Sequence, residues 1–141
     1  MRASMTAGGR ERCKSIECIW GDPNGALGAL ALSGMAFKNG RQNKAALNLL
    51  APRPGDSVLE LGCGPGMGLR DALKRVGREG FVAGVDHSGT AAHFAAHVVH
   101  DYVRAGRAAV TRAEAVDLPS RDHMFDRAFA VNSFQFWSDP A

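Results

Sequence analysis

A glycine-rich stretch that follows a short apolar run constrains this chain more than any other feature. The apolar run, residues 58–61, has the character of a buried strand. Four glycines follow it at alternating positions: Gly62, Gly64, Gly66 and Gly68. Apolar residues then recur at helical spacing as far as Val76. A strand, a tight glycine turn and a helix start direct backbone N–H groups and a helix N-terminus at a ligand, so we expect a binding site at this turn.

The spacing of the glycines does not fit the dinucleotide fingerprint G-x-G-x-x-G/A. Counted from Gly62 the third glycine would fall on Met67, and counted from Gly64 it would fall on Leu69. Acidic residues flank the stretch instead. Glu60 stands two positions before the first glycine, and Asp86 ends the next apolar run about twenty residues further on. A carboxylate there can accept both ribose hydroxyls of a bound nucleoside.

Strands and helices alternate along the chain with short links, which predicts an α/β fold with a parallel, doubly wound sheet. Strands are expected at residues 58–61, 81–85, 108–110 and 125–132. Helices are expected at residues 26–37, 43–50, 67–76 and 88–104, the last capped by Ser88 or Thr90. The length of 141 residues suits one domain. We assign residues 19–141 to it and residues 1–18 to a flexible tail.

The composition, 45% hydrophobic and 22% charged, is that of an ordinary soluble domain. No apolar run approaches the roughly 20 residues that span a bilayer, and no secretory signal is evident, so a cytoplasmic location is expected. The net charge of +3 is scattered, which gives nucleic-acid binding little support. Cys13 and Cys18 have the spacing of neither a zinc knuckle nor a redox pair, which favours free thiols.

Three histidines, His93, His97 and His100, share one face of the helix predicted at residues 88–104. Residues four apart on a helix are neighbours and could hold a metal ion. A solvated polar face explains the same pattern, because the opposite half of the helix is apolar and no acid or cysteine completes a site. We therefore expect no metal.

Taken together, these motifs resemble the first two-thirds of a class I S-adenosylmethionine (SAM) dependent methyltransferase. The similarity is greatest to the small-molecule type that includes ubiquinone and menaquinone biosynthesis enzymes. The matching stretches are residues 53–66, 84–88, 113–115 with 118–119, 125–126 and 131–137. The resemblance implies a Rossmann-like sheet with strand order 3-2-1-4, SAM as cofactor, and methyl transfer to a small-molecule or lipid-like acceptor.

The resemblance also implies a role for individual residues. Glu60 would contact the ammonium group of the cofactor directly or through water, and Asp86 would bind the ribose hydroxyls. His87 would flank the adenine, whose edge would lie at Glu114 and Ala115. Asn132 would border the methyl-bearing sulfur. The loop that lets the backbone pass the methionine and ribose would consist of Gly62, Cys63, Gly64 and Gly66. The sequence identifies no general base.

Each of these residues also has a structural explanation. The glycines could allow helix–strand packing, Asp86 could cap a helix, Glu114 could be a solvated loop carboxylate, and Asn132 could be a turn amide. The function has alternatives as well. The chain could be a catalytically inactive protein that binds SAM or S-adenosylhomocysteine or regulates a partner, or a remnant with an empty pocket.

The family fold continues beyond its fourth strand, whereas this sequence stops at Ala141. We therefore expect an incomplete sheet that lacks the C-terminal strands and leaves the fourth strand at an edge. Phe129, Val131 and Phe134 would then expose apolar surface and unpaired backbone groups, which natural proteins avoid. A second copy of the chain is expected to cover this edge in a homodimer.

Overall fold

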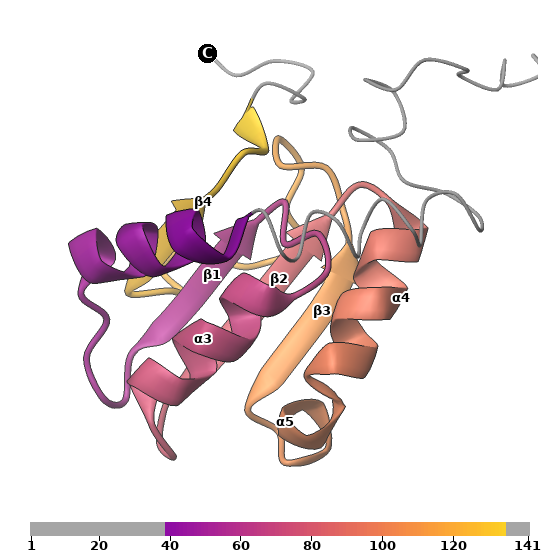
Figure 1. Cartoon of the computed structure of the whole chain (residues 1–141). Helices are drawn as coiled ribbons and strands as arrows, with labels where there is room; N and C mark the ends of the chain where they lie inside the picture. The colour runs from indigo at the N-terminus through magenta and orange to yellow at the C-terminus, as the bar shows by residue number, and fades with distance from the viewer. Residues whose placement is uncertain (1–38, 135–141) are drawn as a thin grey trace, which may run out of the picture.

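A four-stranded, all-parallel sheet organises residues 39–134, the part of the chain that the computed structural model describes (Figure 1). The strands run in the order β3-β2-β1-β4, which confirms the predicted order. Their bounds are β1 Ser57–Leu61, β2 Phe81–Asp86, β3 Ala108–Arg112 and β4 Arg127–Ala130. The predicted tail at 1–18, the predicted helix at 26–37 and both Cys13 and Cys18 lie outside the described residues.

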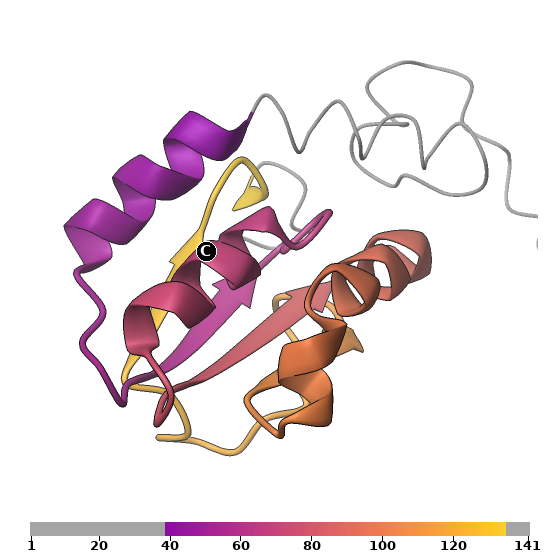
Figure 2. The same cartoon turned by 60° about the horizontal axis from the view of Figure 1, so that its bottom comes forward.

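The described helices cover one face of this sheet (Figure 2). They are a helix over residues 39–50, α3 Met67–Val76, α4 Gly89–Val98 and the single-turn α5 His100–Arg104. Helix α3 has the predicted bounds. Its leucines and valine recur every three or four positions, so Leu69, Leu73 and Val76 are all buried against the sheet.

The core lies between the sheet and this helical layer. Val58 of β1 is in register with Val82 of β2, and both are fully buried. Leu47 joins them from the helix over residues 39–50. Arg75 of α3 holds the end of that helix, because its guanidinium donates to the carbonyl of Leu47 at 2.8 Å. Each fully buried leucine contributes roughly 1.5–3 kcal/mol to stability.

The helix predicted at residues 88–104 is interrupted. Val99 takes φ −109° and ψ 20°, which ends α4 and starts α5. Adjacent β-branched residues at 98 and 99 pack tightly against the preceding turn and lower the helix propensity there. The interruption changes the direction of the chain, so Val103, expected on the buried face, is 40% exposed. Of the two predicted caps, Ser88 and Thr90, Ser88 caps α4 and accepts from the N–H of Ala91 at 3.3 Å.

Strand β4 is shorter than the predicted 125–132. The side chain of its first residue, Arg127, is held by two hydrogen bonds. Arg127 Nε donates to Asp56 Oδ2 at 2.6 Å, and its Nη1 donates to the carbonyl of Leu50 at 3.2 Å. Two hydrogen bonds lower the pKa of Asp56. The larger effect comes from the N–H of Arg53 and the smaller from the Arg127 guanidinium. The expectation that Phe129 is exposed was wrong, because it is 9% exposed and packs in the core beneath the helices.

The opposite face of the sheet is covered, among the described residues, by the segment of residues 113–126 rather than by a helix (Figure 1). A pocket of about 120 Å³ lies between this segment and the strands. Its walls include Leu59 and Ala83 from the sheet and Leu118 and Phe125 from the segment. Phe125, expected to open β4, therefore packs beneath the sheet.

Candidate active site

The glycine loop leaves the carboxyl end of β1 and crosses to the end of β2. The N–H groups of Gly62 and Cys63 both donate to the carbonyl of Val85, at 2.8 and 3.0 Å. Gly62, Gly64 and Gly66 have φ of 71°, 49° and 81°. Residues with a Cβ avoid this region, so the loop can turn this sharply only with glycine at these positions.

Asp86 is the acceptor around which the loop closes. Its Oδ2 accepts from the Gly64 N–H at 2.8 Å, and its Oδ1 accepts from the Ser88 N–H at 2.9 Å. The residue is 7% exposed. The glycine loop thus begins just after Glu60 on β1 and is hydrogen-bonded to Asp86 at the end of the neighbouring strand β2.

Glu60 lies beneath the first turn of α3 and is 3% exposed. Gly68 leaves room for it, because a Cβ on Gly68 would lie 2.7 Å from Glu60 Cδ. The N–H of Leu69 hydrogen-bonds the carboxyl group, so Glu60 satisfies part of a helix start whose N-cap, Gly66, has no side chain. Glu60 Oε2 is buried and has no hydrogen-bond partner.

The surroundings of Glu60 favour its neutral form. Burial raises the pKa of Glu60 well above its usual value of 4.5, and the charge of Asp86 raises it further, while the N–H of Leu69 lowers it. Burying an unpaired carboxylate costs several kcal/mol. The positive N-terminal end of a helix stabilises a nearby negative charge by up to about 2 kcal/mol. The cost of burial is larger than this stabilisation, so the neutral form of Glu60 is favoured.

Two glycines of the loop are required by contacts within the protein. A Cβ on Gly62 would overlap the Cβ of Ser133 and lie 2.7 Å from its hydroxyl. A Cβ on Gly66 would lie 2.9 Å from the Cα of Ala95 in α4. Gly62 thus lets the loop approach the turn after β4, and Gly66 lets it approach α4, rather than allowing a helix to pack on a strand.

Cys63 belongs to the core rather than to the surface of the loop. Its side chain is 3% exposed and packs among the buried apolar residues. Burial raises the pKa of its thiol well above the usual value of 9.0, and the charge of Asp86 adds to this. The thiol is thus held neutral, and the Cys63 side chain is directed away from the face where a ligand would lie.

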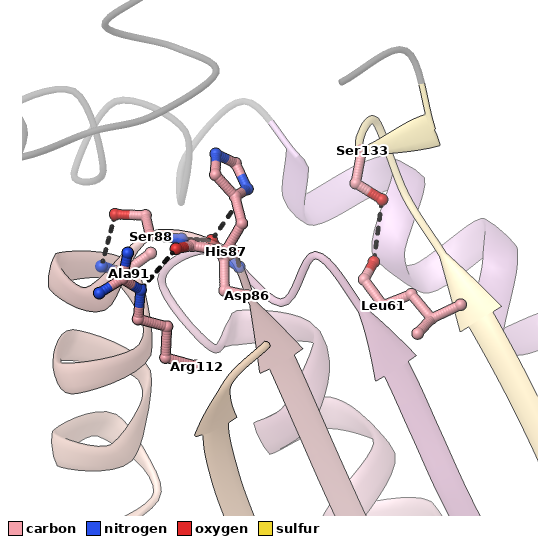
Figure 3. Close-up of polar contacts among 8 residues, drawn as sticks. Leu61, Asp86, His87, Ser88, Ala91, Arg112 and Ser133 are labelled. Carbon is pink, nitrogen blue, oxygen red and sulfur yellow. Dashed lines mark hydrogen bonds and ion pairs between the residues drawn. The ribbon is translucent and has the colours of Figure 1, made fainter. Parts of the chain in front are cut away.

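The turn after β2 is fixed by four neighbouring contacts (Figure 3). Ser88 caps α4, and its N–H also binds Asp86. His87 is partly exposed, with Nδ1 3.7 Å from Asp86 Oδ1. Arg112, at the end of β3, donates from Nε to the His87 carbonyl at 3.0 Å. Sequence reasoning missed Arg112. Its register opposite Asp86 in a parallel sheet was the signal that could have found it.

Glu114 and Ala115 follow β3 in the segment that leads away from the sheet. Glu114 is exposed and forms an isolated antiparallel bridge with Asp117, whose N–H donates to the Glu114 carbonyl at 3.1 Å. Ala115 is partly buried. The start of this segment is tied to the site through the Ala113 N–H, which donates to the Asp86 carbonyl at 3.0 Å.

The turn after β4 reaches the glycine loop through Ser133 rather than through Asn132. Asn132 is exposed, has φ 55°, and donates from Nδ2 to Asn39 Oδ1 at 3.0 Å. The Ser133 hydroxyl donates to the Leu61 carbonyl at 2.9 Å (Figure 3). Sequence reasoning gave Ser133 no role, since only the tertiary structure places it against Gly62.

The helical histidines lie away from this site. His93, His97 and His100 are exposed, and the rings of the last two stack 6.1 Å apart. Across residues 39–134, no three side chains of His, Cys, Asp or Glu gather in a way that could hold a metal ion. Within the same range, no helix has the length and apolar character to cross a membrane.

Comparison with known proteins places this chain in a family. The methyltransferase domain family matches residues 58–141. A methyltransferase of Bacillus subtilis, the uncharacterized YdaC, is 31% identical over 105 residues, which are 74% of this chain and 55% of that protein. The chain thus spans about half the length of this curated relative.

Solved structures agree with the sequence match. A SAM-dependent methyltransferase from Aquifex aeolicus superposes with a TM-score of 0.62 at 26% identity, over 70% of this chain and 52% of its own. The methyltransferase in a complex with the Haloferax volcanii Trm112 activator gives 0.65 at 25% identity, over 77% and 46%. The site and both kinds of similarity agree, and this chain belongs to the class I SAM-dependent methyltransferase family.

Proposed function

We propose that this chain binds SAM across the carboxyl ends of β1 and β2 and transfers its methyl group to a small-molecule or lipid-like acceptor. One observation carries the proposal. The Gly64 amide and the Asp86 carboxylate meet at 2.8 Å and join the glycine loop to the end of β2, in a chain of the methyltransferase family. Ligands of open α/β sheets bind outside the carboxyl ends of the strands.

The residues present fit this cofactor. An ionised carboxylate has about four lone-pair positions, and the two backbone N–H groups on Asp86 use two of them. Two positions are left for a pair of ribose hydroxyls. Glu60 adds a second carboxyl group whose Oε2 has no partner, and a carboxyl there suits the ammonium of an amino-acid tail.

When bound, SAM supplies a methyl group already activated on a sulfonium. The protein therefore has to bind and orient the two reactants and exclude water, and proximity then supplies much of the rate. Asp86 and the glycine loop would hold the nucleoside, His87 would flank its base, and Ser133 would fix the loop from the side of β4. A general base is needed only where the acceptor must lose a proton.

Calorimetric titration with SAM tests the binding step. Transfer of a radiolabelled methyl group from SAM to separated fractions of small metabolites, lipids, protein and RNA tests the acceptor. We expect binding, and label in the metabolite or lipid fraction. Label confined to protein or RNA would contradict the acceptor class, binding without transfer would favour the inactive or regulatory alternative, and no binding would refute the proposal.

We also propose that the chain works in the cytoplasm as a homodimer paired along β4. Ala128 and Ala130 of β4 are exposed, and Phe134 just after it is 56% exposed, so apolar surface lies along this strand. Cys63 is a free thiol, as expected in a reducing compartment. Light scattering should give twice the chain mass at micromolar concentration, and a Phe134→Asp variant should give the mass of one chain. A monomeric wild-type protein would contradict the dimer.

A further inference from the structure

We propose that Glu60 carries a proton in the free protein and releases it when a cationic ligand binds over the glycine loop. Ligand binding would then be coupled to the loss of one proton from this side chain. The inference rests on the proposed SAM site, but its first half concerns the free protein alone and can be tested without a ligand.

Within residues 39–134, the geometry around Glu60 provides a single donor for a group that, when ionised, would need several. The carboxyl group is buried under the first turn of α3, and the donor from that part of the chain is the Leu69 N–H. Oε2 has no partner. Gly68 lies directly over the carboxyl carbon and has no side chain that could shield it or pair with it. An ionised carboxylate in this position would leave a buried charge largely unsatisfied.

The charged groups that face Glu60 are acids. Asp86 at the end of β2 and Asp71 on α3 both oppose a negative charge on Glu60. Cys63 in the loop is neutral because burial raises the pKa of its thiol well above 9.0. From β4 the register partner is Phe129, which is apolar. Among residues 39–134, no lysine or arginine forms an ion pair with Glu60.

The two buried acids differ in their hydrogen bonds. Asp86 accepts from two backbone N–H groups, which suits a charged carboxylate. Glu60 has one such donor and faces the Asp86 charge. Two like charges so close in a buried site are best relieved by a proton on one of them, and the group with fewer donors takes it.

A cation over the loop reverses this balance. The ammonium and sulfonium groups of SAM would supply a positive charge that residues 39–134 do not place in an ion pair with Glu60, and an opposite charge nearby favours the ionised form of an acid. The O–H bond of the Glu60 carboxyl then breaks, the electron pair stays on Oε2, and the proton passes to the buffer. No covalent change in the ligand is required.

Calorimetry of SAM binding in buffers of different ionisation enthalpy measures this proton directly. For the wild-type protein, at pH values where the free form holds the Glu60 proton, we expect release of close to one proton, and an affinity that rises as much as tenfold per pH unit in that range. Glu60→Gln keeps the shape but has no proton to release, so its binding should show neither effect. His93→Gln, at an exposed histidine of α4, serves as the control and should leave the release intact.

The free protein gives a separate readout. In a carbon NMR titration, the carboxyl signal of Glu60 should change at a pH well above the usual glutamate value of 4.5. A Glu60 signal that titrates near that usual value would overturn the inference even if SAM binds. SAM binding without proton release would overturn it as well. If the Glu60 signal changes at a raised pH but SAM does not bind, the proposed function is refuted, whereas the conclusion that Glu60 is protonated in the free protein still stands.

Discussion

Gly64 and Asp86 are 22 positions apart in sequence, yet the amide of one donates to the carboxylate of the other at 2.8 Å. This bond joins the loop after β1 to the end of β2. The second oxygen of Asp86 accepts from Ser88 at the start of α4. One carboxylate thus sets the positions of two backbone segments that a ligand at the strand ends would touch.

Replacing Asp86 with alanine should weaken SAM binding by about 2–4 kcal/mol, because the variant loses charge-assisted hydrogen bonds to the ribose. Calorimetric titration measures the effect. A circular dichroism spectrum should show whether the variant is folded, because the Gly64 N–H of the loop also loses its hydrogen-bond acceptor. The exposed Asp122 provides a control whose alanine variant should bind normally. Equal affinities for Asp86→Ala and wild type would show that Asp86 has no part in binding.

Gly62→Ala should destabilise the protein through two separate effects. The left-handed φ of 71° costs about 1–2 kcal/mol for a residue with a Cβ. Overlap with Ser133 adds about 1–3 kcal/mol. Gly55→Ala isolates the first effect, because Gly55 has φ 90° and open space around it. Denaturant unfolding measures both variants.

A double substitution tests the overlap itself. Ser133→Gly removes the atom that the new methyl group would strike, so it should recover part of the loss in Gly62→Ala, whereas Ser133→Ala should recover none. If Gly62→Ala and Gly55→Ala cost the same, Ser133 does not constrain the loop.

Glu60→Gln should change the pH dependence of stability. The pKa of Glu60 is raised in the folded state, so the wild-type protein gains stability from its proton below about the usual 4.5 and loses that gain as pH rises towards the folded value. The loss amounts to at most about 1.4 kcal/mol per pH unit. The free energy of unfolding of the glutamine variant should lack this decline. Parallel profiles for the two proteins would contradict the expectation, and Glu79→Gln should follow the wild type.

Arg112→Met should weaken SAM binding by about 0.5–1.5 kcal/mol, the value of one hydrogen bond. Methionine keeps an unbranched apolar stem beside Gly89 but cannot donate to the His87 carbonyl. The turn that carries Asp86 and His87 would then be held less firmly. Titration calorimetry provides the measurement, with Arg78→Met on the exposed surface as the control. An unaltered affinity would mean that the Arg112 contact does not position the turn.

The sequence alone determined the bounds of α3, a capping residue at 88 or 90 and the two acids at the ends of β1 and β2, and the family resemblance implied the strand order. These features are encoded locally: periodicity gives the buried face of a helix, and glycines mark a turn that other residues cannot make. The family resemblance rests on the same short stretches. Local patterns of this kind survive into the folded structure because packing reinforces them.

Only the tertiary structure decided what each residue faces. Periodicity does not reveal that Ser133 fills the space beside Gly62, that the Cys63 thiol is directed into the core, or that Phe129 is buried beneath the helices. Nor does it reveal that Glu60 is buried with a single donor beside the charge of Asp86. Burial and electrostatic coupling depend on distances between segments far apart in the chain, and these distances exist only once the sheet has formed.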